Sequence, residues 1–360
     1  MTTIYLASHD SLICVRGGNG HWEARRQLHG RAPRSLAVDR HRPERVWCGT
    51  AGDGLWRSVD AGASWHRAGA GLAAAHVSAV AVSPHERAGE DGVVYAGTDP
   101  SALFRSEDGG ATWEELTALR ALPSASSWSF PPRPETSHVR WITLDPSEGT
   151  TLYVCIEAGA LVRSRDGGRT WLDRMPGGPL DTHTLEVHPE VPGRLYSAAG
   201  DGVMGGHGYN ESWDGGDSWT HPEGGLEHHY LYGLAVDPGD PGTVVVSAAE
   251  SPRAAHDPGR ASATSTGVRV TSRGARCGTG CRKPVAACGR CWRHTLPNRG
   301  CSTPAAIAAS SAQATPASAG KRCACQSRYP WSMPSLCPFS TSGAHTAAPG
   351  GSSTPAIKLT

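Results

Sequence analysis

The 360-residue chain has only three phenylalanines and four methionines, and it contains no run of about 18 consecutive apolar residues. A membrane-spanning helix is therefore not expected. Residues 1–16 lack the basic leader and the apolar core of a signal peptide, so we expect a cytoplasmic protein that does not bind membranes. The formal net charge of +1 gives no indication of a nucleic-acid partner.

Acidic side chains are missing from one part of the chain. Residues 1–257 carry 21 Lys and Arg against 33 Asp and Glu, a formal charge of −12, whereas residues 258–360 carry 13 Lys and Arg and no acid. Eight of the 11 cysteines also fall in residues 258–360. We therefore predict a folded unit over residues 1–257 and a disordered or non-native basic segment, rich in Cys, Ser and Pro, over residues 258–360.

Three interpretations of residues 258–360 remain open: a disordered tail, a zinc or disulfide module, and a stretch translated out of frame. A zinc module would use the closely spaced ligands Cys277, Cys281, Cys288, Cys291 and His294. The out-of-frame interpretation can be tested with the genetic code. When the codons of residues 300–326 are read one base out of register, permitted third bases allow a further copy of the repeat described next. We therefore favour a shift of frame near residue 260.

Four segments of residues 1–257 share the template S-x-D-x-G-x-[ST]-W. The copies contain Ser58, Asp60, Gly62 and Trp65; Ser106, Asp108, Gly110 and Trp113; Ser164, Asp166, Gly168 and Trp171; and Ser212, Asp214, Gly216 and Trp219. Their tryptophans are 48, 58 and 48 residues apart, and a worn fifth copy ends at Trp22. Asp and Ser side chains bind backbone N–H groups in such a turn, Gly supplies a positive φ, and Trp enters the core. We assign these residues a structural role.

The sequence around each copy predicts β-strands. Residues 77–83, 93–97 and 102–106 have alternating or continuous apolar patterns bounded by turn residues, and a fourth strand follows Trp113. Four short antiparallel strands in each unit of 43 to 58 residues are typical of a β-propeller blade.

The template resembles the BNR or Asp-box repeats of sialidases, sortilin-type receptors, xyloglucan-active glycosidases and photosystem II assembly factors. This resemblance covers about residues 1–255 and implies an all-β propeller of four-stranded antiparallel blades. About five and a half blades are encoded in the present frame, and a restored frame would give about seven. The resemblance implies the fold more directly than the function, because these families share blades and little chemistry.

Strand order places the candidate functional residues opposite the Asp-box turns. In a blade with strands A to D, the loops before A and after B lie at one end, whereas the boxes occupy the C–D turns at the other. The loops before A carry Arg31, Arg34, His76, His138, Arg140, His183, His228 and His229, and the loops after B carry Asp53, Asp99, Glu157, Asp201 and Glu250. Imidazoles and carboxylates around one channel mouth predict a divalent metal or a small polar ligand. The alternative is that they cap and solvate strand ends.

One loop interrupts the period. The interval from Trp113 to Trp171 is ten residues longer than its neighbours, and it offers Trp128 and Phe130 for stacking, Arg133 for an anion and Glu135 as a carboxylate. This combination predicts contact with a sugar or another polar ring. The alternative is a lid packed over the channel.

Two functions remain in competition. The first is a propeller scaffold that binds a small polar ligand or a protein at its mouth. The second is a glycoside hydrolase of the sialidase-like or a related type, using paired carboxylates such as Glu135 and Asp201. The sialidase Arg-Ile-Pro element is absent, although Arg34, Arg133 and Arg140 with Tyr230 or Tyr232 and Glu157 supply the residue types of a sialidase site. Whether the protein is an enzyme stays open on the sequence alone.

Overall fold

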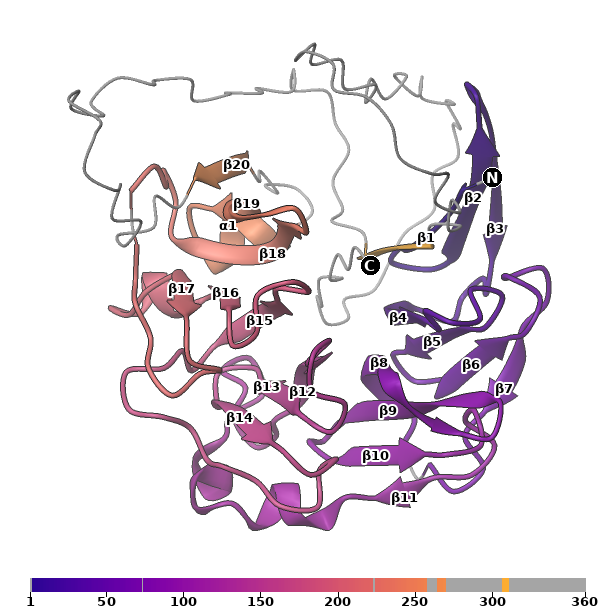
Figure 1. Cartoon of the computed structure of the whole chain (residues 1–360), viewed down its shortest axis with the longest axis horizontal. Helices are drawn as coiled ribbons and strands as arrows, with labels where there is room; N and C mark the ends of the chain where they lie inside the picture. Colours follow the sequence, from indigo (N-terminus) through magenta and orange to yellow (C-terminus); the bar gives the residue numbers. More distant parts are fainter. Residues whose placement is uncertain (1, 73, 223, 258–263, 270–305, 311–360) are drawn as a thin grey trace, which may run out of the picture.

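The computed structural model describes residues 2–72, 74–222, 224–257, 264–269 and 306–310 (Figure 1). Six antiparallel β-sheets follow one another around a common centre. This arrangement confirms the predicted all-β propeller. In the described part of the chain, no helix is both long and apolar enough to cross a membrane.

Each sheet is a blade built mainly from consecutive strands, and blade 1 takes one further strand from a distant part of the chain. Blade 1 contains β1 (Thr2–Ala7), β2 (Leu12–Gly18) and β3 (His21–Gln27); blade 2 contains β4 (Pro33–Val38), β5 (Val46–Thr50), β6 (Leu55–Ser58) and β7 (His66–Ala68); blade 3 contains β8 (His76–Ala88), β9 (Asp91–Asp99), β10 (Leu103–Ser106) and β11 (Glu114–Glu115). Blade 4 contains β12 (Val139–Leu144), β13 (Leu152–Ile156) and β14 (Ala160–Ser164); blade 5 contains β15 (Thr182–Val187), β16 (Leu195–Ala199) and β17 (Tyr209–Ser212); blade 6 contains β18 (Tyr230–Asp237), β19 (Asp240–Ala249) and β20 (Thr264–Arg269).

Short elements complete the blades and their connections. Single bridges between Arg163 and Leu172 and between Glu211 and Thr220 provide the beginning of a fourth strand in blades 4 and 5. The helical segments are η1 (Thr117–Ala121), η2 (Pro123–Ser127), η3 (Asp201–Val203) and α1 (Pro252–His256). The segments η1 and η2 lie in the long loop between blades 3 and 4.

Two strands come from beyond residue 257. Strand β20 pairs with β19, and β21 (Ala306–Ser310) pairs antiparallel with β1, so that the N-terminal blade acquires a fourth strand. The predicted zinc ligands Cys277, Cys281, Cys288, Cys291 and His294 lie outside the described residues.

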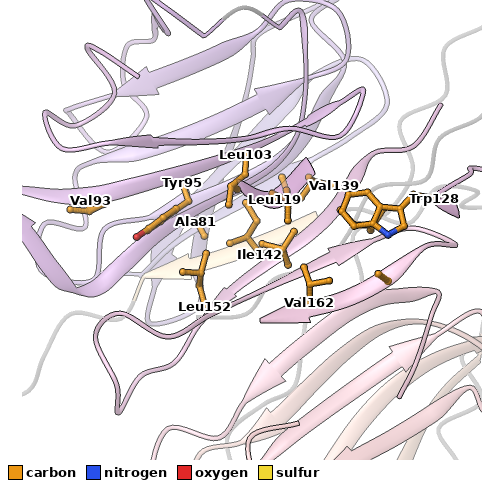
Figure 2. Packing of buried hydrophobic residues seen from close by; sticks show 14 residues of the cluster. Ala81, Val93, Tyr95, Leu103, Leu119, Trp128, Val139, Ile142, Leu152 and Val162 are labelled. Atoms are coloured by element: carbon orange, nitrogen blue, oxygen red, sulfur yellow. The ribbon is translucent and has the colours of Figure 1, made fainter. Parts of the chain in front are cut away.

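The core lies between neighbouring blades. Between blades 3 and 4, Tyr95 and Leu103 pack with Ile142, Leu152 and Val162 in one buried cluster (Figure 2). All five residues of β13 are buried, because this strand has a blade on each side. Burial on both faces explains why the central strands read as nearly continuous apolar runs.

Glycine is required where blades approach each other most closely. A Cβ placed on Gly97 in β9 would lie 2.3 Å from Cγ1 of Val139 in β12. A Cβ on Gly49 in β5 would similarly lie 2.5 Å from the carbonyl oxygen of Val77 in β8. Any larger residue at either position would push adjacent blades apart.

The repeated template closes the turn that follows the third strand of blades 2 to 5. In the first copy, the Ser58 hydroxyl donates to Asp60 Oδ1 at 2.7 Å, and the Gly62 N–H donates to Ser58 Oγ at 2.7 Å. The backbone N–H and the hydroxyl of Ser64 donate to the two carboxylate oxygens of Asp60 at 2.8 and 2.6 Å. Gly62 has a φ of +79°. The same hydrogen bonds recur in the copies that begin at Ser106, Ser164 and Ser212.

Candidate functional site

Antiparallel register brings the starts of the first strands and the ends of the second strands to one end of the propeller. Val139 at the start of β12 pairs with Ile156 at the end of β13, and Thr182 in β15 pairs with Ala199 in β16. The third strands run the other way, so the box after Ser164 lies at the opposite end. Side chains from the loops before the first strands and after the second strands therefore lie at one end of the propeller, and the box turns lie at the other end.

Blades 4, 5 and 6 converge there in a group that we call the mouth cluster. It consists of His138, Arg140, Glu157, Asp181, His183, Tyr230, Tyr232 and His256. Four of these residues were predicted as mouth ligands from the sequence: His138, Arg140, Glu157 and His183.

Glu157, just after β13, is the centre of the mouth cluster. Its Oε2 accepts a hydrogen bond from His138 Nε2 at 2.8 Å and lies 3.4 Å from Arg140 Nε, whereas Oε1 lies 4.0 Å from His183 Nε2. Burial acts to raise the pKa of Glu157, but the His138 hydrogen bond and the surrounding cationic groups hold it well below its usual range. Glu157 is therefore a carboxylate at neutral pH.

His183 in β15 has no solvent-exposed surface and a fixed orientation. Its Nδ1 lies 2.6 Å from the Leu231 carbonyl oxygen, which can only accept, so Nδ1 carries the proton and donates. Nε2 points toward Asp181 Oδ1 at 3.6 Å and toward the Tyr230 hydroxyl at 3.5 Å. The free nitrogen of a buried imidazole thus faces two carboxylates and a phenol.

Aromatic rings from β18 form one wall of the mouth cluster. The Tyr232 ring lies 4.6 Å from the His183 ring and 4.7 Å from the Arg140 guanidinium carbon. The Tyr230 hydroxyl is 2.8 Å from Nε2 of His256, in α1. Burial lowers the pKa of His256 to about 4 and raises the pKa of Tyr230, so both groups are neutral at physiological pH.

The mouth cluster contains a second carboxylate, Asp181, and a third, Asp201, borders it. Asp181 Oδ1 accepts the backbone N–H of Ala158 at 2.8 Å, which ties the start of β15 to the end of β13. Asp201, the first residue of η3, accepts the backbone N–H groups of Leu180 and Asp181 at 3.1 and 2.9 Å. Burial raises the pKa of Asp201, in contrast to that of Glu157.

The predicted residues of blade 2 form a separate group. Asp53 pairs with Arg31 at 2.6 Å and with Arg67, and it accepts the indole N–H of Trp56 at 3.1 Å. Asp53, Arg67 and neighbouring small residues line a recess of about 440 Å³.

Arg34, in β4, is a predicted residue of blade 2 that lies outside this group. It is close enough to Tyr232 and Arg140 of the mouth cluster to interact electrostatically with them, and burial lowers the pKa of its guanidinium group.

Other predicted residues lie around the same end without joining the mouth cluster. His76 is exposed at the start of β8, opposite Asp99, and Asp99 pairs with Arg133 of the long loop. Glu135 and Glu250 are exposed. His228 and His229 lie immediately before β18.

The long loop folds over blade 4. Trp128 is only 8% exposed and belongs to the core between blades 3 and 4 (Figure 2). Its indole N–H donates a hydrogen bond to Ser124 Oγ at 3.0 Å. The prediction that Trp128 provides a stacking surface for a ligand is therefore wrong, because its ring is used for packing. Phe130 contacts His138 edge to face, with ring centroids 4.8 Å apart, and Arg133 lies over the Phe130 ring.

The sequence did not single out Asp181 or His256. Asp181 stands two residues before His183, in a loop before strand A. The sequence pattern predicted acidic residues of the mouth only in the loops after strand B. His256 follows β19, the second strand of blade 6, and it immediately precedes Asp257, the last acidic residue of the chain. Only the contacts between blades bring them to the mouth cluster.

No protein-family model matches this chain. A xyloglucanase from a Paenibacillus species is 35% identical over 130 residues, which cover 31% of this chain and 12% of the relative. An ancestral GH74 enzyme superposes with a TM-score of 0.51 at 16% identity, covering 67% of this chain and 30% of its own. The GH74 xyloglucanase from Xanthomonas campestris has a TM-score of 0.50 at 18% identity, with 73% and 42% covered.

These likenesses show the β-propeller fold. The chain spans less than half the length of each of these relatives, so the similarity does not establish their activities for this protein.

Proposed function

We propose that this propeller binds a small polar ligand at the mouth cluster. The supporting observation is a set of buried nitrogens without partners. His138 Nδ1, Arg140 Nη2 and His256 Nδ1 are inaccessible to solvent and have no hydrogen-bond partner among the residues that the structure describes. Buried polar atoms are nearly always hydrogen-bonded in folded proteins, so three such atoms within one cluster favour a ligand that completes them.

The chemistry of these groups defines the ligand class. Arg140, and Arg34 beside it, favour oxygen acceptors such as hydroxyl or carboxylate groups. The Tyr232 face and the carboxylates of the mouth cluster suit a ring that carries both apolar C–H faces and hydroxyl donors. A carbohydrate has all of these features, and the xyloglucanase likeness makes xyloglucan oligosaccharides the first probe.

Isothermal titration calorimetry with xyloglucan oligosaccharides tests this proposal. We expect saturable binding that weakens at least tenfold in Arg140→Lys, since lysine keeps the charge but loses the planar donor fork. His76→Gln is the matched control, because His76 occupies the equivalent loop of blade 3 but is exposed. The absence of binding to a panel of neutral and acidic sugars, or equal affinities in Arg140→Lys and the wild type, would overturn the proposal.

A glycoside hydrolase is the second candidate. Burial raises the pKa of Asp201, while the pKa of Glu157 is held low, and two carboxylates with opposite shifts are the arrangement that separates a general acid from a base or nucleophile. A sialidase mechanism has less support. Burial raises the pKa of Tyr230, which opposes the formation of a phenolate nucleophile. Arg133, on the long loop, is already paired with Asp99 at the end of β9.

A further inference from the structure

We propose that Glu157, Asp181 and His183 form a binding site for a divalent transition-metal ion. Their ligand atoms lie within 4.8 Å of one another, and the three residues come from the end of β13 and the start of β15. This inference goes beyond the proposed ligand function and does not depend on the identity of the ligand.

The orientation of His183 is the first argument. Because Nδ1 donates to the Leu231 carbonyl oxygen at 2.6 Å, a neutral ring directs its Nε2 lone pair at Glu157 and Asp181. A lone pair that faces two carboxylates is repelled by them, and the Tyr230 hydroxyl at 3.5 Å offers it only a long hydrogen bond. A cation bound between the three groups removes this repulsion. Metal-binding histidines are characteristically fixed in this way, with the second ring nitrogen donating to a carbonyl or carboxylate.

The hydrogen bonds of the carboxylates are the second argument. His138 donates a hydrogen bond to Oε2 of Glu157, and Arg140 forms an ion pair with the same oxygen, so that Oε1 is left directed toward His183. Asp181 is anchored by the N–H of Ala158. The side chains of Glu157 and Asp181 are only 12% and 20% exposed, so these are ordered ligands rather than solvated surface acids.

Distances are the third argument. Metal bonds of about 2.1 Å place two ligands of one ion at most about 4.2 Å apart. The distances from His183 Nε2 to Asp181 Oδ1 and Glu157 Oε1 are 3.6 and 4.0 Å, within that limit. The third pair, Glu157 and Asp181, lies within 4.8 Å, so binding one ion requires these two carboxylates to approach each other by at most about 0.6 Å. One imidazole with two carboxylates suits Mn²⁺, Fe²⁺ or Zn²⁺ better than the all-oxygen sites preferred by Mg²⁺ or Ca²⁺.

The surroundings leave room for exchange at the ion. Three protein ligands do not complete the coordination of these metals, and Tyr230 lies 3.5 Å from the same nitrogen of His183. An oxygen atom of a bound ligand would then meet the metal, the Tyr230 hydroxyl and the Arg140 guanidinium together.

The competing explanation is a proton instead of a metal. A doubly protonated His183 would also neutralise Glu157 and Asp181. Manganese is the appropriate probe, since the cysteines of residues 277–337 would compete for zinc through their thiolates. The full chain is titrated with Mn²⁺ at pH 7.5, and free Mn²⁺ is followed by its electron paramagnetic resonance signal.

We expect one Mn²⁺ bound per chain and at least tenfold weaker binding in Asp181→Asn, which keeps an acceptor for the Ala158 N–H. Glu157→Gln should weaken binding as well, and it serves as the second variant if Asp181→Asn does not melt cooperatively. Asp99→Asn is the control, because Asp99 is a carboxylate of the same rim that pairs with Arg133. Absence of binding by the wild type, or unchanged affinity in both ligand variants, would overturn the metal site. A wild type that binds sugar but not Mn²⁺ would leave the ligand proposal standing and overturn only the metal site.

Discussion

The indole N–H of Trp47 donates a hydrogen bond to the carbonyl oxygen of Gly109 at 3.1 Å, and this bond joins blade 2 to the S-x-D-x-G-x-[ST]-W turn, or box, of blade 3. Arg57, the cross-strand neighbour of Trp47, donates to the same carbonyl oxygen at 2.7 Å. The second and third strands of one blade therefore hold the box of the next blade.

The same relationship recurs between blades 4 and 5. The Tyr153 hydroxyl donates to the Gly215 carbonyl oxygen at 3.1 Å, and its cross-strand neighbour Arg163 donates to the same atom. The box thus closes a turn within its own blade and also presents a carbonyl oxygen to the preceding blade. The repeat is conspicuous in the sequence partly because it serves both contacts.

The substitution Trp47→Phe should destabilise the fold. Phenylalanine cannot donate to Gly109, and it fills less of a site in which Trp47 is fully buried, so we expect a loss of about 1–3 kcal/mol in the free energy of unfolding. Urea unfolding followed by circular dichroism measures this loss. Trp22→Phe is the control, since Trp22 is 43% exposed, and it should change stability by less than about 0.5 kcal/mol. Equal stabilities of the two variants would contradict a structural role for the contact between blades.

The box carboxylates should make stability depend on acid pH. Hydrogen bonds from the Ser64 side chain and backbone lower the pKa of Asp60 to about 2, below its value of about 3.9 in an unfolded chain. Because the folded state binds the proton less tightly, the contribution of Asp60 is fully present above about pH 4 and is lost as the pH falls toward 2. Thermal melting between pH 2 and 6 should show a shallower decline in Asp60→Asn than in the wild type. Parallel curves for the two proteins would show that this carboxylate does not contribute.

The blades could be predicted from the sequence because the interactions that close each turn are local and recur in each repeat. Each template contains the side chains that close its own turn, and a spacing of 48 residues between tryptophans specifies a unit rather than a chance match. The end of the propeller at which the loops gather also follows from strand order. The sequence therefore indicates that His138 and His183 lie at the same end of the propeller, where both are near Glu157.

Other features depend on contacts that no single segment encodes. The burial of Trp128 depends on the packing of the long loop against the core between blades 3 and 4, and Asp181 enters the mouth cluster through its approach to the end of β13. The pairing of β21 with β1 joins the two most distant described parts of the chain. A local pattern contains no signal for any of these.

We propose that the basic segment after residue 257 arises from a shift of frame, and DNA sequencing tests this. The last acidic residue is Asp257, and a further Asp-box is permitted within residues 300–326 in the other register. We expect the source DNA around codons 260–262 to show one base gained or lost relative to a frame that continues the repeats. An uninterrupted present frame in independent isolates would contradict this proposal.

Asp201→Asn separates the binding function from the hydrolytic one. If Asp201 is a general acid, it must be protonated to act, and the pKa raised by its burial keeps it protonated to a higher pH than an ordinary carboxyl group. Activity on xyloglucan oligosaccharides should then decline as the pH rises through that pKa. We expect Asp201→Asn to lower kcat about 100-fold or more and to remove this decline.

Leaving-group dependence completes the test of Asp201. An aryl glycoside with an acidic phenol needs little protonation, so Asp201→Asn should retain much more activity on it than on the oligosaccharide. Glu227→Gln is the control, since Glu227 is an exposed carboxylate in the loop before β18 at the same end and should leave both rates unchanged. Equal losses on both substrates would assign Asp201 to holding the N–H groups of Leu180 and Asp181, because a distorted loop impairs every substrate alike. Wild-type binding without turnover of either substrate would establish the propeller as a binding protein.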